Sequence, residues 1–192
     1  MHRLTFATLM AGTLAVLPAT ASESYVLDSS HTFPSFEVMH LGYSIQRGRF
    51  NKTTGRITLD KAARKGTVDI TIDATSVDTG YDKLEKHLRA EDFFDVERHP
   101  TITFKGDAFT FEGDKVKSVS GNLTLRGVTK PVTLTATHFN CANHPMAKKM
   151  ACGGDFTAMV KRSDFGMKYA LPDVADDVTL RVKLPEGAVW SD

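Results

Sequence analysis

The segment GTVDITID, residues Gly66–Asp73, alternates between two kinds of side chain. Val68, Ile70 and Ile72 fall on one face of an extended chain, and the threonines and aspartates fall on the other. Because successive side chains of a strand point to opposite sides, this period of two predicts a β-strand with one buried face. The same period recurs on both sides of the segment and decides the class of the fold.

Turn signals separate the repeats of this pattern, since glycine or proline stands between them, as at Gly55, Gly113 and Pro131. Many amphipathic strands at short spacing predict an antiparallel barrel or sandwich. The barrel is the stronger expectation, because closure removes the open strand edges. The expected inward residues are Ile57, Leu59, Ile102, Phe104, Phe109, Phe111, Leu123, Leu125, Val132, Leu134, Phe156, Ala158, Val160, Val178, Leu180, Val182 and Leu184.

One segment, Tyr81–Glu91, departs from the period of two. Tyr81, Leu84 and Leu88 stand at positions i, i+3 and i+7, on one helical face, so the segment predicts a single short helix. Asp82 and Glu85, three residues apart, predict a capping box at its start, with Asp82 in place of the usual serine or threonine.

Phe36, Val38 and His40 share one face of a further predicted strand near the N-terminus. An eight-stranded barrel is either filled by its own side chains or hollow enough to hold a ligand, and the pattern fits both. In a hollow barrel, an inward His40 near a strand end would meet the polar head of the ligand. In a filled barrel, His40 would be a core residue hydrogen-bonded to a backbone carbonyl.

The first 21 residues are typical of a secretory signal. A weakly basic start precedes the uncharged apolar run Leu4–Leu17, and the tripeptide that ends at Ala21 is a small-x-small cleavage site. The run is short for a bilayer span, so cleavage is favoured over a membrane anchor. We therefore expect one mature domain at residues 22–192, soluble and outside the cytoplasm.

The charge of this domain argues against nucleic acid as a partner. Arg3, in the predicted signal, is one of the 24 basic residues, which leaves 23 basic against 23 acidic residues. Phosphate binding requires a basic surplus or stripe, and the balanced composition supplies no surplus.

Cys141 and Cys152 are the two cysteines of the chain. In an exported protein they most simply form a disulfide. The alternative is a zinc site that adds His138 and His144 to the two cysteines. The spacing fits no standard zinc finger and an oxidising compartment removes free thiolates, so the disulfide is favoured and no metal is expected.

The sequence contains no familiar catalytic motif. G-x-S-x-G, a P-loop, H-E-x-x-H and C-x-x-C-H are all missing. We therefore expect a protein that is not an enzyme and needs no cofactor. The alternatives are a hydrolase-type enzyme that acts on a lipid head group through His40 and Asp82, and a metal-dependent stress protein.

Several motifs, in one order along the mature chain, together resemble the YceI-like family. They extend over essentially the whole predicted domain, which makes the resemblance more specific than any single motif. The motifs are F-x-V-x-H-x-G at 36–42, GRF at 48–50, TSVDT at 75–79, DKLEKHLRAEDFF at 82–94, HP at 99–100, GNLTLRGVTKPV at 121–132 and RSDFGM at 162–167.

The resemblance implies a lipocalin-like, eight-stranded antiparallel β-barrel with one short helix, exported to the bacterial periplasm. It implies non-catalytic binding, with transport or storage, of a long isoprenoid lipid in the lumen, either a polyisoprenoid or an isoprenoid quinone. It also implies association with a membrane b-type cytochrome. The segment from Cys141 to Cys152 is a feature of only a subset of the family. The ligand contacts that it implies are Phe36, Val38, His40, Leu88, Phe94 and Phe165.

Overall fold

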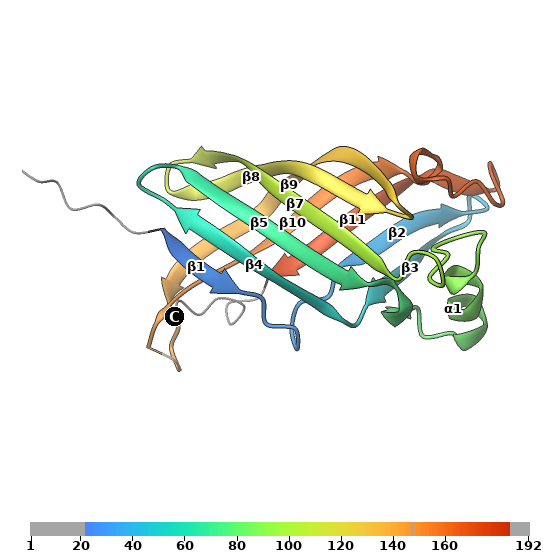
Figure 1. The fold of residues 1–192 in the computed structure, drawn as a ribbon, viewed down its shortest axis with the longest axis horizontal. Helices are drawn as coiled ribbons and strands as arrows, with labels where there is room; N and C mark the ends of the chain where they lie inside the picture. Colours follow the sequence, from blue (N-terminus) through green and yellow to red (C-terminus); the bar gives the residue numbers. More distant parts are fainter. Residues whose placement is uncertain (1–21, 147, 185–192) are drawn as a thin grey trace, which may run out of the picture.

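In residues 22–146 and 148–184, which the computed structural model describes, the protein forms one antiparallel sheet of eleven strands and one α-helix (Figure 1). The predicted signal, residues 1–21, lies outside this part of the chain. The elements are β1 (Glu23–Val26), β2 (Ser35–His40), β3 (Ser44–Phe50), β4 (Thr53–Asp60), β5 (Lys65–Asp73), η1 (Ala74–Ser76), β6 (Val77–Asp78), α1 (Asp82–Arg89), β7 (Thr101–Glu112), β8 (Lys115–Leu125), β9 (Val128–Asn143), β10 (Met150–Lys161), η2 (Arg162–Phe165) and β11 (Val174–Leu184).

Eleven strands replace the expected eight because three of the barrel strands are interrupted. Only Asn51 and Lys52 separate β3 from β4, and the hydrogen bonding crosses this break. The Asn51 amide donates to the Ser76 carbonyl at 3.0 Å, and the Asp73 amide donates to the Lys52 carbonyl at 3.0 Å. In the same way, β5 and β6 flank η1, and β1 and β2 both pair with the β3–β4 segment. Joined end to end, these pairs leave eight rows, so the barrel-like, all-β prediction is confirmed although the strand count differs.

The sheet curls until its pairing returns to the starting row. From β4 the order runs β5-β7-β8-β9-β10-β11-β2-β3, with neighbours hydrogen-bonded. Because β3 continues into β4, the last strand of this series leads back to the first. Figure 1 shows the strands winding obliquely around one long body, with α1 beyond one end.

The predicted alternation is confirmed in the segment that decides the fold. Val68, Ile70 and Ile72 are buried, while Thr67 and Asp69 on the opposite face are exposed. The inward rows of the other strands form one apolar cluster with them. The core therefore lies inside the curl of the sheet.

Helix α1 starts without the predicted capping box. Tyr81 is its N-cap residue and makes no side-chain cap hydrogen bond, so the prediction for Asp82 and Glu85 is wrong. Glu85 instead accepts a hydrogen bond from the Thr79 amide at 3.0 Å and pairs with Arg89 at 3.3 Å. With eight residues, α1 is too short to span a bilayer, and the described part of the chain contains no other helix that could do so.

Cys141 and Cys152 form the predicted disulfide across the hairpin of β9 and β10. The two residues are direct partners in the strand register, with their Cα atoms 4.0 Å apart. Both sulfurs belong to the disulfide, so they are not thiolates that could complete a zinc site with His138 and His144.

Candidate ligand-binding lumen

An apolar chamber, which we call the main chamber, occupies the inside of the barrel next to the α1 segment. Its empty space, open mouth included, is about 1120 Å³. Only Ser35, Arg162 and Arg181 among its lining residues are polar or charged. The wall therefore offers a hydrocarbon chain a long apolar surface. The apolar lining residues are Pro34, Phe36, Val38, Phe50, Ile70, Ile72, Leu88, Phe93, Phe94, Ile102, Phe104, Leu123, Leu125, Val132, Leu134, Val160, Met167, Val174, Val178, Leu180 and Val182.

Three phenylalanine rings meet in one part of this wall. The Phe36 ring centre lies 6.0 Å from that of Phe50 and 5.9 Å from that of Phe94, and the rings of Phe50 and Phe94 are 5.3 Å apart, edge to face. Gly48 pairs with Phe36 in the register, and a Cβ atom at Gly48 would lie 2.3 Å from the Phe36 ring. The glycine therefore leaves the space that the Phe36 ring occupies.

The α1 segment closes one side of the chamber with apolar side chains. Leu88 lies on the buried face of the helix, and the Phe94 amide donates to the Leu88 carbonyl at 2.9 Å. This turn brings Phe93 and Phe94 to the wall directly after the helix. Phe93 also packs with His87 and Tyr169, at ring-centre distances of 4.9 and 5.6 Å.

Arg162 is a buried cation in the wall, with 4% of its surface exposed. Its guanidinium donates to four backbone carbonyls of residues 167–175. Burial lowers the pKa of the guanidinium, and the nearby charge of Asp176 opposes that shift. The chain between η2 and β11 is thus wrapped around this side chain. The acceptors are the carbonyls of Met167 at 3.1 Å, Tyr169 at 2.8 Å, Val174 at 2.8 Å and Ala175 at 2.9 Å.

Four of the six residues predicted as ligand contacts line the main chamber: Phe36, Val38, Leu88 and Phe94. They come from β2, from α1 and from the turn that follows α1. The structure brings these segments together around one space, while their contact with a ligand stays a prediction.

The other two predicted contact residues lie outside the chamber wall. Phe165 is 1% exposed and packs in the core. His40 is exposed at the end of β2, where the pairing of β2 with β11 is irregular near Val174. It is not part of the chamber lining, and its contact with the head of a ligand stays a prediction. Asp82, the second residue of the enzyme hypothesis, is exposed at the start of α1.

Phe50 and Arg162 also line the wall, although they are not among the ligand contacts predicted from the sequence. Phe50 was available from the Gly48-Arg49-Phe50 motif, since it follows the alternation of β3 and is buried. Arg162 gave no comparable signal, because arginine is rarely buried without a partner and its acceptors here are backbone groups.

A second space, which we call the far chamber, adjoins the main chamber. Its empty volume, open mouth included, is about 630 Å³. Ile70, Phe104, Leu134 and Val182 line both chambers. The residues that line the far chamber but not the main chamber are Tyr25, Ile57, Leu59, Val68, Phe109, Val116, Val119, Phe139, Cys152, Gly153, Phe156 and Leu184.

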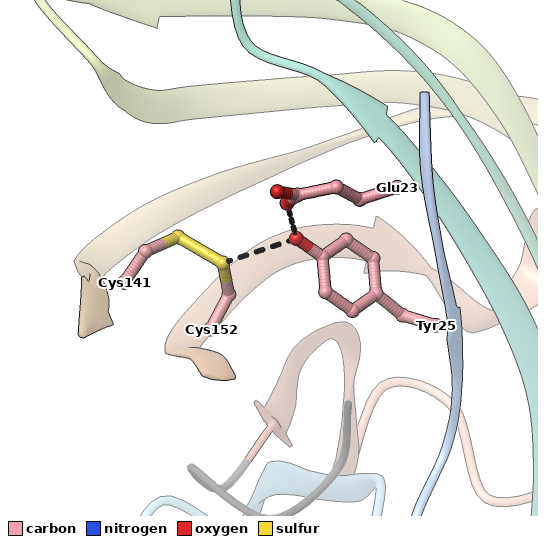
Figure 2. Close-up of a disulfide and its surroundings, with 4 residues drawn as sticks. All are labelled: Glu23, Tyr25, Cys141 and Cys152. Carbon is pink, nitrogen blue, oxygen red and sulfur yellow. Dashed lines mark hydrogen bonds between the residues drawn. A yellow bond between two sulfur atoms is a disulfide. The ribbon is translucent and has the colours of Figure 1, made fainter. Parts of the chain in front are cut away.

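Figure 2 shows the disulfide beside Tyr25 in the wall of the far chamber. The Tyr25 hydroxyl donates to the Glu23 carboxylate and lies 3.8 Å from the Cys152 Sγ atom. Burial raises the pKa of Tyr25, and the hydrogen bond and charge of Glu23 raise it further. Tyr25 therefore remains a neutral phenol, and its ring forms part of the apolar wall.

Comparison with known proteins gives the same family along most of the chain. A family model described as a YceI-like domain matches residues 25–185. A UPF0312 protein of Pseudomonas paraeruginosa is 38% identical over 184 residues, which cover 94% of this chain and 95% of that protein. A protein named YceI from Escherichia coli O157:H7 is 37% identical over 186 residues, with 94% and 93% covered.

Solved structures share the fold. BcnA of Burkholderia cenocepacia matches with a TM-score of 0.71 and 26% identity, over 82% of this chain and 98% of that one. A YceI protein of Campylobacter jejuni matches with a TM-score of 0.68 and 26% identity, over 80% and 90%. A domain of Saccharophagus degradans described as polyisoprenoid-binding matches with a TM-score of 0.59 and 18% identity, over 85% and 99%. The resemblance seen in the motifs is thus confirmed, and the chain belongs to the YceI-like family.

Proposed function

We propose that this protein binds a long isoprenoid lipid in the lumen and transports or stores it outside the cytoplasm. The observation that supports this most directly is the nearly wholly apolar wall of the main chamber, which surrounds about 1120 Å³ of space when the open mouth is included. Burial of an apolar chain gains about 0.8 kcal/mol per CH₂ group. A nearly insoluble lipid therefore needs few polar contacts to bind tightly.

The class of lipid is proposed from the family and from one structural neighbour. The Saccharophagus degradans domain is described as polyisoprenoid-binding, and at 18% identity it shares the fold with this chain. The proposed ligand is accordingly a polyisoprenoid or an isoprenoid quinone. A quinone ligand would make a membrane b-type cytochrome a natural partner.

We propose binding without catalysis. His40 and Asp82, the residues through which a head-group hydrolase would act, are exposed and belong to the wall of neither chamber. The main chamber offers space and an apolar wall, which are the features that a lipid carrier needs.

The proposed place of action is the periplasm. It rests on the signal-like residues 1–21 and on cleavage after Ala21. Intact-mass measurement of the exported protein tests this: a mass that begins at Ser22 supports the proposal, and retention of Met1–Ala21 contradicts it.

Solvent extraction of the natively purified protein, followed by mass spectrometry, tests the ligand. We expect one isoprenoid lipid, enriched over an equal mass of the remaining periplasmic protein. Delipidated protein should then rebind solanesol, measured by mass spectrometry of the lipid extracted from the reisolated protein. Extraction of no enriched lipid together with failure to bind solanesol would contradict the proposal.

A further inference from the structure

Four side chains stand between the two chambers. Ile70, Phe104, Leu134 and Val182 line both spaces, and we call these four residues the waist. They belong to β5, β7, β9 and β11, so they reach the lumen from several sides of the barrel. Any chain that passes from the main chamber to the far chamber must pass them.

Three of the four waist side chains are buried, and the fourth, Val182, is half-buried. Ile70 and Phe104 are direct partners in the register of β5 and β7, and each is 5% exposed. Leu134 is 8% exposed. Phe104 has the largest side chain of the four, so its ring is the main obstacle between the chambers.

The far chamber suits the end of a hydrocarbon chain. Apart from the Tyr25 hydroxyl, its lining side chains are apolar, and that hydroxyl is already hydrogen-bonded to Glu23. Phe109, Phe139 and Phe156 add aromatic surface. A polar head group would find no free partner among these side chains, whereas a tail would bury apolar area.

We propose that the waist sets the length of the bound tail, with the Phe104 ring as the stop. A tail fills the main chamber and ends at this ring, and the far chamber is reached only when the ring is removed. This inference rests on the proposed lipid binding and adds to it the residue that selects among tails of different length.

The test measures affinity against tail length. Farnesol, geranylgeraniol, solanesol and decaprenol share one head group and differ in the number of isoprene units. For the wild-type protein, affinity should rise along this series until the tail reaches the waist and then change by less than about twofold. In Phe104→Ala the rise should continue, with a gain of at least about tenfold beyond the wild-type limit, because each further buried CH₂ is worth about fourfold in affinity.

Two further variants make the result specific. Phe111→Ala removes an equal ring from the same strand at a position that lines neither chamber, so the wild-type length limit should remain. Phe104→Leu removes less volume and should extend the length limit only partially. It takes the place of Phe104→Ala in the test if the alanine variant does not fold. Far-UV circular dichroism establishes that each variant is folded.

The outcomes separate the two proposals. Equal dependence on tail length in the wild type and in both Phe104 variants would overturn the waist inference and leave lipid binding intact. A wild-type protein that binds none of the four alcohols would overturn both. A change of the limit in Phe111→Ala as large as that in Phe104→Ala would also overturn the inference, because the effect would then not belong to the waist.

Discussion

The hydroxyl of Tyr25 lies 3.8 Å from the Sγ atom of Cys152, which is 127 residues later in the chain. Tyr25 belongs to β1, whose described strand partner is β4, and Cys152 belongs to the hairpin of β9 and β10. The contact therefore joins two segments that are not neighbours in the sheet order. Since Cys152 is bonded to Cys141, the far chamber ends against a cross-linked wall.

Replacement of both Cys141 and Cys152 by serine should lower the free energy of unfolding by about 3 kcal/mol, because the bridge closes a short loop in the unfolded chain. The two residues are 11 apart in sequence. Guanidinium denaturation measures the loss, and reductant should cause a similar loss in the wild type. Alkylation without reductant should label neither cysteine. Tyr25→Phe keeps both the ring and the disulfide and serves as control: loss of the hydrogen bond to the Glu23 carboxylate should cost about 1.5–3 kcal/mol, and the further loss on reduction should remain. Equal stability of the wild type and the double variant would contradict the prediction.

Val38→Trp tests whether the main chamber is hollow. Val38 is half-buried in the chamber wall. In an empty space the indole occupies room meant for ligand, so the lipid-free variant should melt near the wild-type temperature while copurified lipid falls sharply. In a filled core the same change would cost about 1–3 kcal/mol through overpacking. Calorimetry of lipid-free protein and quantification of extracted lipid decide between them, and a marked loss of stability would show solid core at this position.

Arg162→Leu should destabilise the protein by about 3 kcal/mol or more, because it leaves buried carbonyls without donors. Arg162→Lys should recover only part of this, since an ammonium group lacks the planar fork that reaches several acceptors. Arg181→Leu is the matched control: this arginine also lines the chamber, but its side chain is 55% exposed and pairs with Glu37. Its removal should cost about 1 kcal/mol or less. Similar losses in both leucine variants, measured by urea denaturation, would contradict the assigned role of Arg162.

Glu37 should contribute stability that is lost in acid. Hydrogen bonds from Arg47 and then Arg181, at 3.0 and 3.2 Å, lower the pKa of the Glu37 carboxyl. A carboxyl whose folded pKa is depressed stabilises the fold above its unfolded pKa, about 4.3, and loses that contribution as the pH falls through the folded pKa. Because both arginines are more than half exposed, the expected contribution is about 0.5–1 kcal/mol.

Comparison of the wild type with Glu37→Gln measures this effect. The difference in unfolding free energy should be largest near neutral pH, shrink as the pH falls below about 4, and be smaller at high salt. A difference that does not change with pH would show that the carboxylate charge is not its source.

The sequence predicted most of the sheet because a strand with one buried face has alternating apolar and polar residues. In Gly66–Asp73 this alternation is complete, and the structure buries the expected residues. The break at Asn51 and Lys52 left no such sign in the sequence, since the residues on each side continue as strand and the hydrogen bonds to β5 and β6 cross it. The number of strands was therefore less predictable than their faces.

The candidate site was predicted where it depends on alternation and missed where it depends on tertiary contact. Phe36 and Val38 follow from their places in a strand. His40 continues the same alternation but is the last residue of β2, where it is exposed and outside the chamber lining. The burial of Arg162 depends on carbonyls of a loop that only the folded chain brings around it.

The closure of the sheet through the β3–β4 segment also affects how molecules of this protein meet one another. The two strands that end the sheet order are short, with four residues in β1 and two in β6. A sheet with a long unpaired edge strand can aggregate, because a strand of another molecule adds to that edge. Within the described residues these two strands offer little template for such growth, and the longer one-sided stretch of β9, residues 136–143, which pairs with β10 alone, is cross-linked to β10 by the disulfide.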